Sequence, residues 1–382
     1  MPCLGGNMKF KKLAAIVLAG ALCLTSFVGC GVDPSETAAT LGDQKVSAGI
    51  VNFICKYQKA TIDDTYVSFF GEDFWDTDLY GYGTTMEEDM KDSVMDSLHD
   101  LYTLKAHMSD YKVTLTDEET ATIKKVAQAF LAANSEEAIK ELGATEEIIV
   151  EVLTLYTIQA KMYDAIALEA DHKVSDEDAN MRGITLVQIG IQGKYNDKGT
   201  YVKYTADEIK ELKATAEKIA TEASSVGLDK AAKNNKQEAQ DTAYNKKDTG
   251  IDATLLKAMN ELKVGETSKV IETKTTLYIV KIDEEVDKKA TEENREAIIK
   301  ERENKVYTEK LKVWQKNDNW SVDDSVVSKI EFHDLLTQKD PNAKDTQKPQ
   351  STEKTESTEK TESTEKTEST EKTESTETTE GK

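Results

Sequence analysis

The distribution of proline constrains this chain more than any other feature of its sequence. The 382 residues include four prolines, and none of them lies between Pro34 and Pro341. Because proline interrupts helices and central strands, this long stretch can form extended uninterrupted helices. A compact β-sandwich, which depends on turns rich in Pro and Gly, is not expected. The length is sufficient for two domains with additional terminal segments.

The charge balance excludes several classes of partner. Lys and Arg total 49 against 72 Asp and Glu, which gives a net charge of −23. Nucleic-acid binding requires a clustered basic face, so no nucleic-acid partner is expected. The negative charge also argues against direct electrostatic attraction to an anionic membrane surface. The four histidines have no metal-ligand spacing, so we expect neither a metal site nor a cofactor.

The N-terminus has the three-part layout of a secretory signal. Lys9, Lys11 and Lys12 precede the apolar run Leu13–Leu24, which is short for a transmembrane helix. Phe27-Val28-Gly29 before Cys30 resembles a bacterial lipobox, with Phe27 where Leu is usual. We predict a signal peptide over residues 1–29, a lipid on Cys30 and a lipidated linker over 30–37. An ordinary secretory signal with cleavage elsewhere is the alternative, and translation starts at Met1 or Met8.

The C-terminal end is of low complexity. From Ser351 the hexapeptide Ser-Thr-Glu-Lys-Thr-Glu repeats in register, without apolar side chains that could offset the loss of chain entropy on folding. We predict a disordered acidic tail over residues 339–382. It would serve as a solubilising tail or as a spacer in the cell wall. Cys55, the one cysteine beyond Cys30, lies in an apolar run and is expected to be a core residue rather than a nucleophile.

Residues 38–173 show mainly helical periodicity. A strand-turn-strand pattern over 39–46 is followed by apolar residues spaced at three and four positions, which predicts an amphipathic helix. The stripe consists of Met90, Val94, Leu98, Leu101 and Met108. A capping box at Thr116 and Glu119 starts a second helix, which we expect to reach Leu131. A third helix is predicted over Thr145–Leu168.

Residues 174–287 change to a mixed pattern. A β-run over Ile184–Ile191 is followed by a turn, a returning strand over Tyr201–Tyr204 and a capping box at Thr205 that opens a helix to about Ala223. Two short helices are predicted over 228–234 and 253–261, and a final hairpin over 268–272 and 276–282. This order of elements predicts a small α+β domain.

The remaining residues, 288–338, are predicted to form a helix over Thr291–Trp314 and a terminal strand over Val326–Phe332. Helical segments on both sides of a small α+β domain can combine into one discontinuous domain. The fold class expected is therefore α+β, with a helical domain made of an N-terminal and a C-terminal part and an α+β domain inserted between them.

Several of these segments resemble the secreted PrsA/SurA-type foldases, which carry a helical chaperone domain and a parvulin-like (rotamase) domain. Gly42-Asp-Gln-Lys-Val-Ser47 with the helix after it is similar to the start of their chaperone domain. Leu262-Lys-Val-Gly-Glu-Thr-Ser268, leading into Thr276–Ile282, is similar to the turn before the last two parvulin strands. The resemblance implies an extracytoplasmic lipoprotein that assists the folding of secreted polypeptides, with peptidyl-prolyl isomerase activity of the parvulin type.

The residues of the parvulin site are mostly replaced. Ile184 stands where the family has a histidine on its first strand, and Tyr278 stands where it has one on its last. No His or Cys occurs between Val174 and Asp287. The resemblance leaves Tyr278 as the candidate catalytic residue and an apolar proline cup made of Leu186, Ile251 and Leu255. Packing in an ordinary domain core is the alternative for each, and the missing imidazoles argue against retained isomerase activity.

Two further groups of residues have alternative interpretations. Met86, Met90, Met95, Met108 and Met162 suit either a flexible client-binding surface or the core. The aromatic-rich stretch Tyr66–Tyr82 suits either a client-binding lip or a cap on the helical core. A solute-binding lipoprotein of a transporter and a non-catalytic surface-display lipoprotein are the competing functions. The solute-binding protein would require two lobes of alternating strands and helices, which the pattern lacks.

Overall fold

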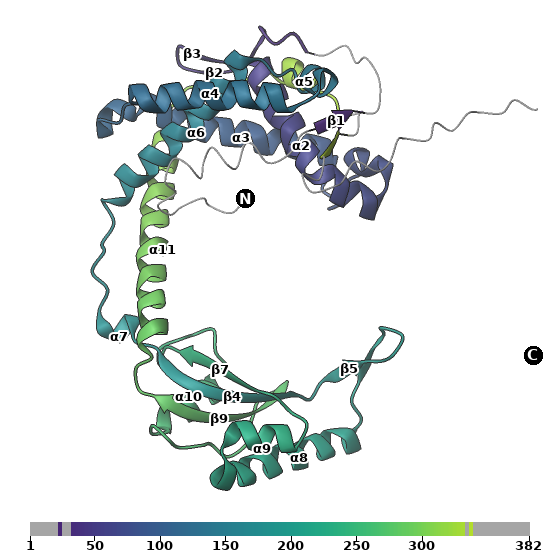
Figure 1. Cartoon of the computed structure of the whole chain (residues 1–382), viewed down its shortest axis with the longest axis vertical. Coiled ribbons are helices and arrows are strands. Elements are labelled where there is room, and N and C mark those ends of the chain that lie inside the picture. Colours follow the sequence, from purple (N-terminus) through teal and green to yellow (C-terminus); the bar gives the residue numbers. More distant parts are fainter. Residues whose placement is uncertain (1–21, 25–31, 333–335, 339–382) are drawn as a thin grey trace, which may run out of the picture. The chain divides into compact units, whose positions relative to one another are not determined.

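The computed structural model describes residues 22–24, 32–332 and 336–338 (Figure 1). Most of the predicted signal peptide, Cys30 and the whole predicted acidic tail over 339–382 lie outside the described residues. Strand β1, Leu22–Leu24, falls within the predicted signal peptide and pairs with β11, Leu336–Gln338. Among the helices of the described part, none is both long and apolar enough to span a bilayer.

A small antiparallel sheet joins residues from both ends of the described chain. Its strands are β2, Thr37–Leu41, β3, Gln44–Ser47, and β10, Trp320–Val322, in the order β10-β2-β3. The predicted turn at Gly42 is confirmed, and its φ of +58° is a conformation that glycine adopts at low cost. The predicted terminal strand over Val326–Phe332 is wrong. This segment begins within helix α12, Asp324–Val327, because Asp323 caps it and the buried residues 326, 327 and 330 follow helical spacing.

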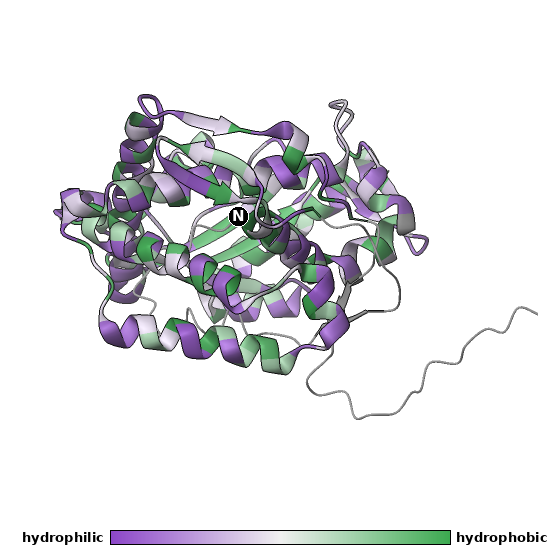
Figure 2. Cartoon of the chain, turned by 90° about the horizontal axis from the view of Figure 1, so that it is seen from above, coloured by the Kyte–Doolittle hydropathy of each residue, from purple (hydrophilic) through white to green (hydrophobic). Residues whose placement is uncertain are grey.

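Five α-helices form the N-terminal helical layer, and the banding of hydrophilic and hydrophobic residues along the helices is visible in Figure 2. They are α2, Ala48–Phe70; α3, Met86–Ala106; α4, Asp117–Ala133; α5, Glu136–Leu142; and α6, Glu146–Ala167. Two short 3₁₀ helices, η1 over Glu72–Asp76 and η2 over Met108–Tyr111, follow α2 and α3. The predicted capping box at Thr116 is confirmed: its hydroxyl accepts from the Glu119 N–H, and Glu119 accepts from the Thr116 N–H.

The long helix α11, Lys288–Gln315, confirms that distant helical segments pack together. Leu311 is buried against Leu104 of α3 and against Ile158, Met162 and Ile166 of α6. The indole ring of Trp314 stacks on the His107 imidazole, with ring centroids 4.1 Å apart. The C-terminal part of the chain therefore completes the core of the N-terminal helices, and the helical domain is discontinuous in sequence.

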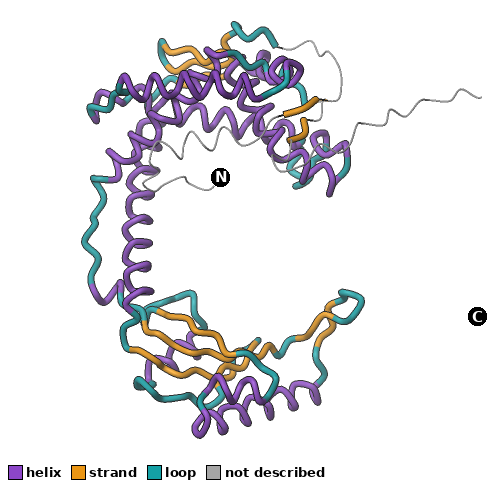
Figure 3. Tube along the Cα trace, in the orientation of Figure 1, coloured by secondary structure: helices purple, strands orange, loops and turns teal. Residues whose placement is uncertain are grey.

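The inserted module is built on a four-stranded antiparallel sheet with the order β7-β4-β9-β8 (Figure 3). The strands are β4, Arg182–Gly190; β7, Ala239–Tyr244; β8, Ile271–Glu272; and β9, Thr276–Glu284. Its helices are α7, Asp176–Ala179; α8, Ala206–Val226; α9, Leu228–Asn234; and α10, Ala253–Glu261. The fold class expected from the sequence, α+β with this module inserted into a helical domain, is confirmed.

Two details of the module differ from expectation. The residues at 201–203 form strand β6, which pairs with β5, Gly193–Tyr195, in a separate two-stranded hairpin rather than returning along β4. Strand β7 was not predicted, because its sequence, Ala-Gln-Asp-Thr-Ala-Tyr, lacks the alternation of large apolar residues by which strands are recognised. It lies at the edge of the sheet, where such a sequence is tolerated.

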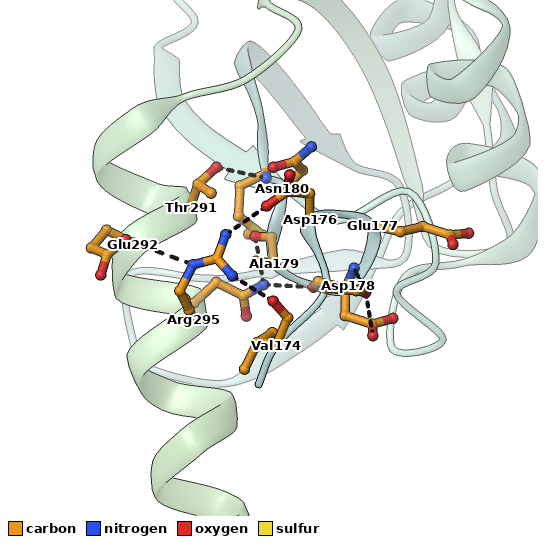
Figure 4. Close-up of polar contacts among 12 residues, drawn as sticks. Val174, Asp176, Glu177, Asp178, Ala179, Asn180, Thr291, Glu292 and Arg295 are labelled. Carbon is orange, nitrogen blue, oxygen red and sulfur yellow. Dashed lines mark hydrogen bonds and ion pairs between the residues drawn. The ribbon is translucent and has the colours of Figure 1, made fainter. Parts of the chain in front are cut away.

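The two crossings of the chain between the helical domain and the module lie side by side (Figure 4). The Thr291 hydroxyl accepts a hydrogen bond from the Met181 N–H at 3.0 Å, and the Asn294 amide donates to the Asp178 and Ala179 carbonyls. The Arg295 guanidinium donates to the Val174 carbonyl at 2.6 Å and pairs with Asp176. These bonds hold α7 against the first turns of α11.

Candidate functional site

The structure brings the four predicted site residues into one apolar cluster on the α10 face of the module sheet. Leu255 is buried, whereas Leu186, Ile251 and Tyr278 are half-buried. They come from three elements and one loop: Leu186 from β4, Tyr278 from β9, Leu255 from α10, and Ile251 from the segment before α10. The buried members of the cluster are Ile184, Tyr244, Leu255, Met259, Ile271, Val280 and Ile282.

The register between β4 and β9 decides which side chains can act together. Leu186 lies opposite Val280, and Ile184 lies opposite Ile282. Ile184, which the resemblance equates with the family's first histidine, is therefore four residues along β4 from Gln188, the strand partner of Tyr278. This separation is roughly 13 Å at a rise of about 3.3 Å per residue. Ile184 and Tyr278 do not form a cross-strand pair, and Ile184 is buried in the cluster.

The residue directly opposite Tyr278 is Gln188, an exposed polar side chain on β4. Ile271 of β8 lies opposite Tyr278 on its other side. The sequence analysis did not single out Gln188, although the period of two along β4 places it on the same face as Ile184 and Leu186. The partly covered end of this face thus offers a phenol and a carboxamide beside an apolar surface.

A buried arginine forms hydrogen bonds to residues of this cluster. Arg182, at the start of β4, donates to the carbonyls of Met259 and Leu262 at 2.9 Å each and to the Tyr244 hydroxyl at 3.0 Å. Its Nη2 pairs with Glu285 at 2.8 Å. Hydrogen bonding to Lys246, and the nearby Arg182, lower the pKa of the Glu285 carboxyl. Arg182 therefore satisfies the carbonyls at the end of α10 and fixes that helix on the sheet.

The four predicted residues and Gln188 offer a peptide apolar contact and hydrogen bonding. Rotation about a peptide bond crosses a barrier of roughly 18–20 kcal/mol, which an isomerase must lower. An enzyme does this by binding the twisted amide better than the planar amide. The Tyr278 phenol and the Gln188 amide can hydrogen-bond to a peptide, and Leu186 and Ile251 can contact an apolar side chain.

The structure also distinguishes between the two interpretations of the methionines and of the aromatic-rich stretch. Met95 and Met162 are buried, and Met86, Met90 and Met108 pack partly buried against the helical core, so the core interpretation of the methionines is favoured. The aromatic stretch divides: Phe74 and Trp75 are core residues, while Tyr66, Phe69, Phe70, Tyr80 and Tyr82 are exposed. Cys55 is a buried core residue, as expected, and burial raises the pKa of its thiol to about 12.

No family model matches the sequence. The chain is 24% identical over 335 residues to the foldase protein PrsA of Clostridium botulinum, which covers 80% of this chain and 95% of the relative. A PrsA foldase structure from Lactococcus lactis covers 78% of this chain and 98% of its own, with 15% identity and a TM-score of 0.34. A SurA-like chaperone structure from Campylobacter jejuni covers 75% of this chain at a TM-score of 0.27. The sequence similarity, which extends over most of both chains, confirms the resemblance to the PrsA-type foldases.

Proposed function

We propose that this protein is an extracytoplasmic foldase that holds unfolded secreted polypeptides, with little or no prolyl isomerase activity of its own. The observation that carries this proposal is the similarity to the PrsA foldases over nearly their whole length, combined with the clustering of the four parvulin-site residues. Unfolded polypeptides are the proposed partners.

The replaced residues favour holding over catalysis. The face that would receive proline keeps apolar side chains at Leu186, Ile251 and Leu255, which suit an unfolded segment. The sequence positions of the two histidines carry Ile184 and Tyr278, and the sheet register does not bring these two together. A neutral phenol beside an amide provides no oriented pair of imidazoles to stabilise a twisted amide.

The competing solute-binding function finds no support in the fold. Such a protein would need two lobes of alternating strands and helices. Across residues 22–24, 32–332 and 336–338, every strand pairing is antiparallel, and the largest sheet has four strands. The two domains differ in architecture, since one is helical and the other is α+β.

A measurement of aggregation tests the holding function. A reduced secreted protein is diluted from denaturant with the mature chain starting at residue 30, and light scattering is followed. We expect scattering to fall as the chain approaches an equimolar ratio. Unchanged scattering at a severalfold excess would contradict the proposal and would favour a surface-display role.

An isomerisation assay tests the catalytic part. With a proline-containing peptide as substrate, we expect the whole mature chain to leave the rate at the uncatalysed value, and Tyr278→Phe to behave identically. A clear acceleration that Tyr278→Phe abolishes would show that the phenol has replaced the imidazole in catalysis.

The membrane anchor is also part of the proposal, and it rests on the sequence around Cys30. Acyl chains on this cysteine would hold the protein at the outer face of the bacterial membrane, since each buried methylene contributes roughly 0.8 kcal/mol. In cells, Cys30→Ala is expected to move the protein from the membrane fraction to the medium or to block its processing. Cys23→Ala is the matched control and should remain membrane-bound. Equal partitioning of both variants with the wild type would contradict the anchor.

A further inference from the structure

The end of α2 and the loop after it expose an unusual number of aromatic rings. Phe69 in the last turn of α2 is 80% exposed, and Tyr82 in the loop after η1 is 83% exposed. Tyr66, Phe70 and Tyr80 are also exposed. We call residues 66–82 the aromatic segment. Exposed aromatic groups of this density are typical of binding surfaces rather than of an inert exterior.

The aromatic segment is fastened to the helical core. Tyr66 and Phe70 both pack on the buried ring of Phe74, with centroids 5.4 and 5.6 Å away. Next to it, the Trp75 indole donates a 2.8 Å hydrogen bond to Asp63, and Asp63 forms a buried ion pair with Lys59. The exposed rings of Tyr66 and Phe70 are therefore held in place, which reduces the entropy lost when a ligand binds.

The loop that carries Tyr80 and Tyr82 is ordered by one carboxylate. Asp78 accepts hydrogen bonds from the backbone N–H of Tyr82 at 3.0 Å and of Gly83 at 2.9 Å. The two tyrosine rings stack with a centroid distance of 6.1 Å. This second pair of rings is consequently also presented in a defined conformation.

The sequence around these rings is rich in acidic residues and contains no basic ones. Between Lys59 and Lys91 there is no Lys or Arg, whereas nine Asp or Glu residues occur. Asp73, Asp76 and Asp78 are exposed within the aromatic segment. A cation that approaches would gain Coulomb attraction from the carboxylates and cation–π attraction from the rings. An anionic lipid surface would be repelled, which argues against insertion of these rings into a membrane.

We propose that the aromatic segment is a binding site for extended polypeptide segments in which apolar or aromatic side chains are interspersed with Lys or Arg. This inference rests on the proposed function and specifies the class of client segment: the rings contact the apolar side chains while Asp73 and Asp76 attract the basic ones. Acidic unfolded segments would be bound weakly here, because the same carboxylates repel them.

The test uses two labelled peptides and the whole mature chain. One peptide alternates Phe and Leu with Lys, and the other carries Glu in place of each Lys. Fluorescence anisotropy should show binding of the Lys peptide at least tenfold tighter than that of the Glu peptide, with a difference that shrinks as salt increases. The double variant Phe69→Ser/Tyr82→Ser should weaken binding of the Lys peptide by roughly tenfold, since exposed aromatic anchors carry much of such binding energy.

A second variant separates charge from aromatic contact. Asp73→Asn/Asp76→Asn should weaken binding of the Lys peptide severalfold and strengthen binding of the Glu peptide. Matched controls lie on the module: Tyr195→Ser removes an equally exposed ring, and Glu211→Gln/Glu217→Gln removes two exposed carboxylates of α8. Both controls should leave the affinity within about twofold of the wild type. Thermal unfolding of every variant should remain at the wild-type temperature, because the altered side chains are exposed.

The outcomes distinguish this inference from the proposed function. If the wild type binds the Lys peptide and both aromatic-segment variants bind it as tightly, the site lies elsewhere and the inference fails while the foldase function stands. Equal affinity for the Lys and Glu peptides would also overturn it. If the wild type binds neither peptide and does not suppress aggregation, the proposed function fails as well. Another contradicting result would be binding of the wild type to anionic vesicles that is lost in Phe69→Ser/Tyr82→Ser. The ligand of the aromatic segment would then be a membrane surface and not a polypeptide.

Discussion

The two faces of the module sheet are covered to different degrees. On one face, α8 and α9 pack small and aliphatic residues against Val187, Ile189 and Ile279, and this cluster contains no aromatic ring among its described members. On the other face, the nine-residue helix α10 covers part of the sheet and leaves Leu186, Ile251 and Tyr278 half-buried. The first face is a closed core, while the second combines a core with an accessible apolar surface.

This difference fits the proposed function, in which the α10 face binds polypeptide without catalysing isomerisation. The α8 face has its own cluster of buried apolar residues, so substitutions among the half-buried residues of the α10 face should cost little stability. Ile184 and Tyr278, which the resemblance equates with the parvulin histidines, pack in the same cluster as Val280 and Ile282. Under the proposed function, the half-buried apolar side chains of the α10 face bind polypeptide without a catalytic pair of imidazoles.

The largest expected effect on stability comes from shortening a buried side chain on the closed face. Ile279→Ala should lower the free energy of unfolding of the module by about 3–4 kcal/mol, because Ile279 is fully buried and a cavity would remain. Leu186→Ala on the α10 face should cost about 1–2 kcal/mol. Urea unfolding followed by circular dichroism measures both. Fluorescence of Trp75, Trp314 and Trp320, all outside the module, reports on the helical domain separately. Equal losses for both variants would mean that the two faces are equally closed.

The next effect concerns how α10 is held on its face. Arg182→Met should destabilise the module by about 2–3 kcal/mol, because the Met259 and Leu262 carbonyls lose their buried donor. Arg182→Lys should fall between the wild type and Arg182→Met, since an ammonium cannot reach all the acceptors together. Hydrogen exchange of the α10 amides is expected to increase more than that of the α8 amides. Equal increases would show that Arg182 does not act through α10.

A smaller effect depends on pH and concerns the start of α8. Hydrogen bonds from Thr205, together with Lys194, lower the pKa of the Glu208 carboxyl from 4.5 to about 2. Because the folded-state pKa is depressed, the stabilisation is complete above pH 4.5 and is lost as the pH falls from about 4.5 to about 2. Glu208→Gln should reduce the pH dependence of unfolding in this window and leave the remainder of the profile unchanged. An identical acid profile for both proteins would contradict the assignment.

The smallest effect is expected from the candidate catalytic residue itself. Tyr278→Phe should change the stability by less than about 0.5 kcal/mol, because the ring stays in the cluster and a half-buried residue can turn its hydroxyl to water. Thermal unfolding measures this. A loss above about 1.5 kcal/mol would show that the phenol is a structural element of a closed core, and the α10 face would then resemble the α8 face.

Local patterns in the sequence were sufficient for much of the fold. The bounds of α9 and α10 follow from apolar spacing, and the capping boxes at Thr116 and Thr205 mark the starts of α4 and α8. Helical periodicity on both sides of the module predicted a discontinuous helical domain, which the packing of α11 on α3 and α6 confirms. These features depend on residues a few positions apart, so a single sequence contains them.

Features that depend on tertiary pairing were not predicted correctly. The edge strand β7 has no apolar alternation. The segment from Val326 was predicted as a strand, whereas the strand that pairs with β2 is β10, a few residues earlier. The apolar residues of the two segments do not indicate which of them pairs with β2. For the candidate site, the sequence indicated residues that the structure brings into one cluster, whereas Gln188 was missed. Its place opposite Tyr278 follows from the register between β4 and β9, which the sequence of either strand does not specify by itself.

The most direct test of the account is the refolding of a client whose slow phase is limited by proline isomerisation. Refolding is started with increasing amounts of the whole mature chain, and both the yield and the slow rate are recorded. We expect a higher yield of native client, with a slow rate that stays at its uncatalysed value. A slow rate that rises in proportion to the chain concentration, with no gain in yield, would contradict it.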